Sequence, residues 1–196
     1  MKKDYAYILL LDQESSSFIT KVQEYIIQKY VKAPIQWPPH ITLARGNFLT
    51  GEELEMVGEK LTTLSTTTTC FKIVSDGFTF EKKSENNYAL RIGIQKSDAL
   101  HNLGKSIFEA TKEFEAPIQT FTNEKYWITI VGGLSEDEKD EIEIYLKDIM
   151  LPEIAPSSFS VFYSVSWIST LTAYPLLSPK YFIRGFELET LTFSCI

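Results

Sequence analysis

The sequence is poor in the residues that bind metals or form disulfides. Its 196 residues contain two cysteines, Cys70 and Cys195, and two histidines. The cysteines lie far apart and show no metal-ligand spacing, so we expect no zinc site, and we take both thiols to be reduced, as they are in the cytosol. We accordingly expect no metal and no cofactor.

The chain also lacks a long apolar run and an excess of basic residues. The first twelve residues, MKKDYAYILLLD, hold a short apolar stretch that ends at Asp12, too short for a signal peptide or a membrane span. The formal charge is -7 and the isoelectric point is about 5.0, whereas binding to long nucleic acid needs a basic surface. A small nucleotide held in a local pocket remains compatible with this charge. We expect a cytoplasmic protein that does not associate with membranes.

The chain does contain a regular succession of strand-like and helix-like segments. Thirteen Phe, ten Tyr and three Trp can supply a core, a binding surface, or both. No linker or low-complexity segment divides the chain, so we expect one domain over residues 1–196. Apolar periodicity predicts strands at 4–12, 40–46, 66–83 (one or two strands, with a bend or bulge at Gly77), 86–95, 126–133, 159–170 and 180–189. It predicts helices at 13–32, 50–65, 97–114 and 135–151, and loops at 33–39 and 115–125.

The order of these segments repeats. Residues 4–65 run strand, helix, proline-containing loop, strand, helix, and residues 87–151 run through the same order. Two similar halves predict two lobes related by a pseudo-twofold axis, with the remaining strands shared between them. The fold class that follows is α+β, with two antiparallel sheets that flank a central cleft and helices on the outside.

The two halves share a short motif. PPHITLARG at residues 38–46 aligns with EKYWITIVGG at 124–133, so that His40 meets Trp127 and Thr42 meets Thr129. Residues two apart on a strand face the same side. We therefore expect all four side chains to face the cleft.

This pattern resembles the two-histidine phosphoesterase superfamily, which includes 2′-5′ RNA ligase-like proteins and cyclic nucleotide phosphodiesterases. In that family one histidine removes a proton from the attacking hydroxyl or water, the other protonates the leaving oxygen, and two hydroxyls hold the phosphoryl oxygens without a metal. The resemblance implies catalytic-site roles for His40, Thr42 and Thr129. The second motif is degenerate, because Trp127 stands where the family has its second histidine. An indole N–H does not exchange a proton near neutral pH, so we do not expect efficient hydrolysis by the family mechanism.

The resemblance implies binding of a small nucleotide, a cyclic oligonucleotide or another nucleotide phosphodiester, with Trp127, Arg45 and Arg91 as candidate ligand-binding residues. Trp127 either stacks on a base, which contributes about 1–3 kcal/mol, or simply fills the cleft. Arg45 either reaches a phosphate or forms a surface ion pair. Arg91 lies on the opposite face of its strand from the apolar residues, and either lines the cleft or meets water.

Two other functions stay open at this point. One is an active 2′,3′-cyclic or 2′-5′ phosphodiesterase that uses His40 with a different proton donor, and the other is a non-catalytic protein-interaction module that retains the fold. His101 is a candidate donor only if its helix turns it into the cleft, and Lys125 or Tyr126 is another, although alternation points Tyr126 away from the face of Trp127. The last explanation for an active enzyme is that Trp127 is not the natural residue.

Overall fold

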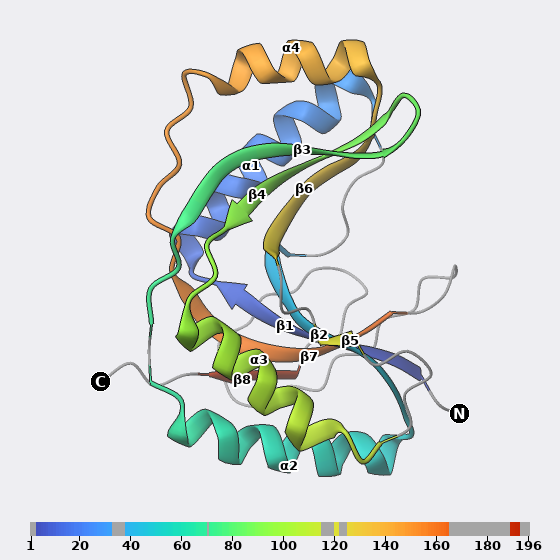
Figure 1. The fold of residues 1–196 in the computed structure, drawn as a ribbon, viewed down its shortest axis with the longest axis vertical. Helices are drawn as coiled ribbons and strands as arrows, with labels where there is room; N and C mark the ends of the chain where they lie inside the picture. Colours follow the sequence, from blue (N-terminus) through green and yellow to red (C-terminus); the bar gives the residue numbers. More distant parts are fainter. Residues whose placement is uncertain are drawn as a thin grey trace.

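The computed structural model describes residues 3–32, 38–69, 71–114, 120–121, 125–164 and 189–192. Its elements are β1 (Lys3–Leu11), α1 (Gln13–Tyr30), β2 (His40–Leu49), α2 (Gly51–Thr67), β3 (Ser75–Ser84), β4 (Asn87–Ile94), α3 (Asp98–Thr111), β5 (Thr120–Phe121), β6 (Tyr126–Leu134), α4 (Glu136–Leu146), β7 (Pro156–Ser164) and β8 (Glu189–Thr192). Helices and strands are both abundant, and the α+β class is confirmed (Figure 1).

The order of helices and strands agrees with the prediction, but several boundaries do not. Strand β3 begins at Ser75 and not at 66, β2 continues three residues past 46, β7 begins at 156 and not at 159, and β8 overlaps the predicted strand 180–189 only at Glu189. Other differences have local causes. Helix α2 runs into the threonine-rich stretch, where hydroxyls bond back to carbonyls of the preceding turn, as Thr66 does to Thr63 at 2.8 Å. Helix α4 ends early, where the Lys147 N–H turns to the carbonyl of Ile144. Strand β5 lies inside a predicted loop. Gly77 has a positive φ of 93° at a register shift of β3, which confirms the bulge. Residues 33–37, 115–119, 122–124, 165–170 and 180–188 lie outside the described residues.

The strands form one sheet and not the two that we predicted. Its order is β3-β4-β6-β2-β1-β7-β8, with β5 beside β2, and every pairing between the described strands is antiparallel. The two halves of the sheet join where Ile41 of β2 pairs with Ile128 of β6. Figure 1 shows β6 and β2 meeting end to end in the middle of the molecule. The sheet is therefore continuous, although its halves meet over a short ladder.

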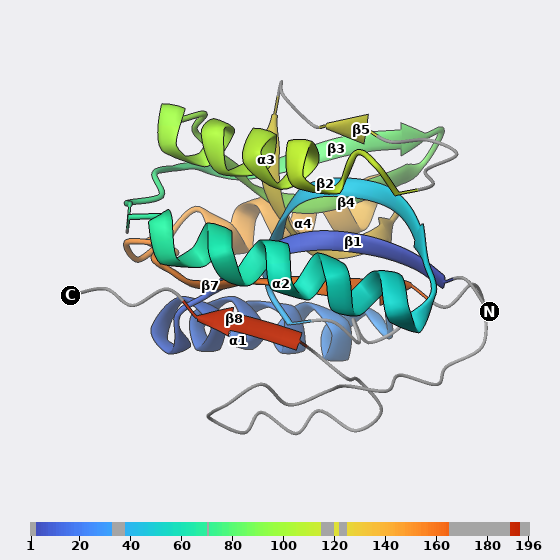
Figure 2. The same ribbon diagram turned by 90° about the horizontal axis from the view of Figure 1, so that it is seen from below.

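Two of the helices, α1 and α3, pack against the half of the sheet that the other half of the chain forms. Helix α1, from the first half of the chain, contacts β6 of the second half, and α3, from the second half, contacts β2 of the first. Figure 1 shows α1 and α4 on the side of β4 and β6. Figure 2 shows α2 and α3 side by side over β1 and β2. One side-chain hydrogen bond joins α1 to β6: the buried amide of Gln23 donates to the carbonyl of Thr129, at 3.4 Å. The strand and helix order repeats along the chain as predicted, while the pseudo-twofold relation and the division into two lobes stay predictions.

One apolar core lies between the helices and the sheet. It takes alternate residues from the strands and the inner faces of all four helices. Its fully buried members, each at most 1% exposed, include Tyr7, Leu9, Ile19, Ile26, Ile41, Leu43, Leu61, Leu90, Ile92, Leu100, Ile107, Ile128, Ile130 and Ile142. The strand residues between these positions face the other side of the sheet, and that face carries the site.

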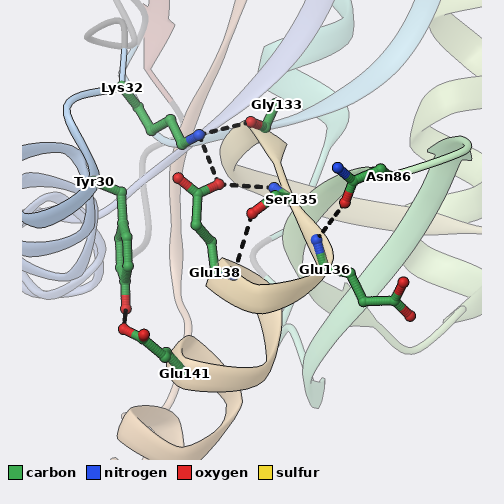
Figure 3. Close-up of polar contacts among 8 residues, drawn as sticks. All are labelled: Tyr30, Lys32, Asn86, Gly133, Ser135, Glu136, Glu138 and Glu141. Carbon is green, nitrogen blue, oxygen red and sulfur yellow. Dashed lines mark hydrogen bonds and ion pairs between the residues drawn. The ribbon is translucent and has the colours of Figure 1, made fainter.

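The start of α4 is held by contacts from three separate parts of the chain (Figure 3). Ser135 and Glu138 form a capping box, in which the Glu138 carboxylate accepts from the Ser135 N–H at 2.7 Å. Lys32, just past α1, reaches the same carboxylate at 2.7 Å and donates to the carbonyl of Gly133 at 2.8 Å. Asn86 at the β3–β4 turn accepts from the Glu136 N–H at 2.8 Å. Helix α4 is thus tied to both α1 and the hairpin.

Glu138→Ala is expected to lower the free energy of unfolding by about 2 kcal/mol, because it removes a cap and a half-buried ion pair together. Glu141→Ala is the matched control on the same helix. The Glu141 carboxylate also meets α1, accepting from the Tyr30 hydroxyl at 3.0 Å, but its side chain is 61% exposed. We expect that change to cost under about 0.5 kcal/mol. Urea denaturation of both variants gives the comparison, and equal losses would contradict the special role of Glu138.

Candidate functional site

Strands β2 and β6 pair at Ile41 and Ile128, which we call the β2–β6 crossing. This pairing brings the two sequence motifs together. Because Ile41 pairs with Ile128 in an antiparallel ladder, the next positions set His40 beside Thr129. Both isoleucines are fully buried in the core, so their neighbours face the opposite side of the sheet. There His40 is half-buried and Thr129 is exposed.

The other two motif residues lie on the far side of the same pair. Thr42 follows Ile41 on β2 and Trp127 precedes Ile128 on β6, which makes them neighbours across the crossing. Both side chains are half-buried. One histidine, two threonines and one tryptophan thus share one face, as the aligned motifs predict, within a single step of the Ile41–Ile128 pair.

The imidazole of His40 is oriented by the loop that precedes it. Its Nδ1 lies 2.8 Å from the carbonyl oxygen of Pro38. A carbonyl only accepts hydrogen bonds, so Nδ1 carries the proton and Nε2 is the basic nitrogen of the neutral ring. This is the tautomer that a general base needs in order to take a proton from a hydroxyl or a water.

Trp127 is stacked against Arg91. The guanidinium carbon of Arg91 lies 4.0 Å from the centre of the indole ring, a close cation–π contact. Arg91 is opposite Thr129 in the β4–β6 ladder, so it belongs to the site face. It is 8% exposed. Of the two alternatives left open by the sequence, Arg91 therefore lines this face and does not extend into water.

Glu81 is a residue of this face that the sequence analysis missed. Its carboxylate Oε2 lies 2.6 Å from Nη1 of Arg91 and 2.6 Å from Nζ of Lys83. The hydrogen bond from Lys83 and the charge of Arg91 hold the pKa of Glu81 below its ordinary value of 4.5, against an opposing effect of burial. Glu81 is thus an anion at neutral pH, set between two cations. The pattern that reveals it is the alternation of β3, which places Thr79, Glu81 and Lys83 on one side, with Thr79 opposite Arg91.

The structure describes Arg45 only by its backbone. It lies on β2, opposite Ala6 on one side and Thr120 on the other. A role for Arg45 in binding a phosphate stays a prediction.

Two of the three alternative proton donors lie away from this face. Tyr126 is 3% exposed and packs in the core, on the opposite face from Trp127, as alternation predicts, and burial raises the pKa of its hydroxyl above 10.0. His101 lies on α3, a helix whose buried side chains join that same core. Lys125 is exposed and directly precedes β6. Neither Tyr126 nor His101 thus belongs to the face that carries Thr129.

The described residues hold no group of three or more His, Cys, Asp or Glu side chains placed to bind a metal ion. No helix among them is both long enough and apolar enough to span a bilayer.

Solved structures of one protein, Escherichia coli LigT, resemble this chain over nearly its whole length. Escherichia coli LigT complexed with phosphate superposes with a TM-score of 0.54 at 14% identity, over 97% of this chain and 98% of LigT. LigT complexed with ATP gives 0.52 at 15% identity, and LigT complexed with 3′-AMP gives 0.51 at 12%, each over 98% of this chain and 99% of LigT. No protein-family model matches the chain, and no curated protein matches its sequence.

LigT is a two-histidine phosphoesterase. The chain has the fold of that superfamily over nearly its whole length, so the resemblance read from the PPHITLARG motif is confirmed at the level of the fold. At identities this low, the similarity establishes the fold and not the activity.

Proposed function

We propose that the chain binds a small nucleotide or nucleotide phosphodiester across the β2–β6 crossing, as a two-histidine phosphoesterase-like protein that does not hydrolyse it efficiently. The observation that carries this proposal is the Ile41–Ile128 pair, which sets Thr42, Thr129 and His40 on one face within one ladder step. The LigT structures with phosphate, ATP and 3′-AMP support a phosphate-containing ligand. A cytoplasmic location and cyclic oligonucleotides as ligands belong to the same proposal.

Each residue of the face has a chemical task in this proposal. The hydroxyls of Thr42 and Thr129 donate hydrogen bonds to phosphoryl oxygens, and the guanidinium of Arg91 supplies positive charge beside Thr129. Trp127 stacks on a base with the side of its ring that Arg91 does not cover, which contributes about 1–3 kcal/mol. The face therefore offers both a phosphate site and a base platform.

The missing histidine decides the catalytic status. Trp127 has no proton to give to a leaving oxygen near neutral pH, and loss of one positioned acid or base typically costs about 10²–10⁴-fold in rate. The orientation of His40 favours a second candidate function, slow phosphodiesterase activity with His40 as the general base. Residual cleavage that disappears in His40→Ala would support that second candidate, whereas cleavage that survives the change would exclude it.

The test uses calorimetric titration with 2′,3′-cyclic AMP, 2′-5′ oligoadenylate and a cyclic dinucleotide, with products followed by chromatography in the same samples. Thr42→Ala and Thr129→Ala are each expected to weaken binding of the best ligand by about 10-fold or more, since a hydrogen bond to a charged group is worth about 1.5–3 kcal/mol. The matched control is Thr63→Ala, whose exposed hydroxyl bonds only within α2 in the described structure. Failure of all three ligands to bind at millimolar concentration would refute the proposal.

A further inference from the structure

Glu81 places a fixed negative charge at the edge of the site face. Its carboxylate, whose side chain is 40% exposed, bridges Arg91 and Lys83 at 2.6 Å each. The three groups together carry one net positive charge. A phosphodiester group carries one negative charge, and a phosphomonoester carries close to two above its second pKa of about 6. The single positive charge of the three residues is thus equal in size and opposite in sign to the charge of one diester group.

The ladder places this anion close to a phosphate bound at the proposed site. Thr79, Arg91 and Thr129 lie in register on β3, β4 and β6, and Glu81 is the next residue of β3 on the same face. Neighbouring strands are about 4.8 Å apart, which sets the Glu81 carboxylate on the order of 10 Å from a phosphate at Thr129. Over this distance, at the partly exposed edge of a protein, one charge changes the affinity for another by about fourfold.

We propose that Glu81 shifts the preference of the site toward singly charged phosphodiesters, relative to doubly charged phosphomonoesters, by weakening the attraction that Arg91 and Lys83 exert on each ligand charge. The inference rests on the proposed nucleotide binding and adds the class of phosphate toward which Glu81 biases the site. Repulsion from Glu81 acts on each unit of ligand charge, so a monoester is disfavoured twice as strongly, in free energy, as a diester of the same nucleoside. Arg91 still attracts both, because its interaction with Trp127 holds it on the site face.

The experiment compares two ligands with the same base and sugar, 2′,3′-cyclic AMP with one charge and 3′-AMP with two, titrated at low salt and pH 8 into the wild type and Glu81→Gln. Removing the charge is expected to raise the affinity for the cyclic ligand by about fourfold and that for 3′-AMP by the square of this factor, about 16-fold. The ratio of the two affinities therefore shifts by about fourfold toward the monoester.

Two further variants separate charge from packing and from overall electrostatics. Glu81→Asp keeps the charge and is expected to keep the wild-type ratio. Glu85→Gln removes the same charge from the exposed turn of the β3–β4 hairpin and is expected to leave the ratio within about 1.5-fold, because that charge is farther away and screened. A melting curve for each variant confirms folding.

The possible outcomes distinguish a failure of the inference about Glu81 from a failure of the proposed nucleotide binding. If both ligands bind the wild type and Glu81→Gln strengthens them by the same factor, Glu81 merely competes for Arg91 and the inference is wrong. The inference is also wrong if Glu85→Gln shifts the ratio as much as Glu81→Gln does. If neither ligand binds the wild type, Glu81 selects between no such phosphates and the inference is wrong, whereas the proposed function is refuted only if 2′-5′ oligoadenylate and the cyclic dinucleotide also fail to bind.

Discussion

Replacing Trp127 with histidine is expected to raise the hydrolysis rate of 2′,3′-cyclic AMP by about 10²–10⁴-fold. The register of β6 against β2 sets residue 127 on the same face as His40, one ladder step beyond Ile128. An imidazole at that position supplies a group able to protonate the leaving oxygen, which the indole cannot do. His40, with its proton fixed on Nδ1, already meets the requirement for the base.

The neighbours of the new imidazole should shape its pH profile. Arg91 lies 4.0 Å from the present ring, and its positive charge would lower the pKa of a histidine at 127 below the ordinary value of about 6.5. Glu81, paired with Arg91, opposes only part of this effect. Because the new acid acts in its protonated form and His40 acts as a base in its neutral form, the activity gained should pass through a maximum on the acidic side of pH 6.5 and decline on either side of it.

The measurement is the rate of product formation by chromatography for the wild type, Trp127→His and Trp127→Phe, across pH 5 to 8. Phenylalanine keeps an aromatic ring without an exchangeable proton and is expected to give no gain. Adding His40→Ala to Trp127→His should abolish the new activity, because the two groups act as a unit. An equal gain in the histidine and phenylalanine variants would contradict general acid catalysis at this position.

The second large effect concerns stability. Ile128→Ala is expected to lower the free energy of unfolding by about 3 kcal/mol, because the side chain is fully buried in the core and its removal leaves a cavity. Ile128 also forms the described pairing between β2 and β6. We expect the variant to lose nucleotide affinity as well, since the positions of Trp127 and Thr129 relative to Thr42 depend on that pair.

Two variants of the same residue type calibrate this result in urea denaturation. Ile128→Val keeps most of the buried volume and is expected to cost about 1 kcal/mol. Ile144→Ala changes an isoleucine on α4 that is 65% exposed and should alter stability by less than about 0.5 kcal/mol. A loss for Ile128→Ala no greater than that for Ile144→Ala would show that the crossing does not depend on this side chain.

Features set by short-range rules could be predicted from the sequence. Alternation along β6 correctly placed Tyr126 in the core and Trp127 on the other face. The helix predicted from residue 50 starts within one residue of α2, at the point where Thr50 and Glu53 form a capping box. The alignment of the two motifs placed His40, Thr42, Trp127 and Thr129 on one face, because strand period and motif spacing are both visible in the chain.

Features set by pairing between distant segments could not be predicted. Nothing in the sequence around Ile41 or Ile128 distinguishes a strand at the edge of one sheet from a strand that continues into another, so two sheets were predicted where there is one. The role of Arg91 stayed open for a similar reason. Its burial depends on the register of the β3–β4 hairpin, which brings Glu81 to it, and on the indole of a third strand.

The exchange of helices between the halves of the sheet has a consequence for the order in which the chain is made. When a ribosome has completed residue 67, β1, α1, β2 and α2 have all been synthesised, but β6, which α1 covers, has not. Strand β1 also lacks its second neighbour until β7 follows. Until β6 is made, the apolar side of α1, with Ile19, Val22 and Ile26, stays exposed. Such a surface can bind chaperones or aggregate. The apolar surfaces of α1 and β1 are thus fully covered only after β6 and β7, late in the sequence, have been synthesised.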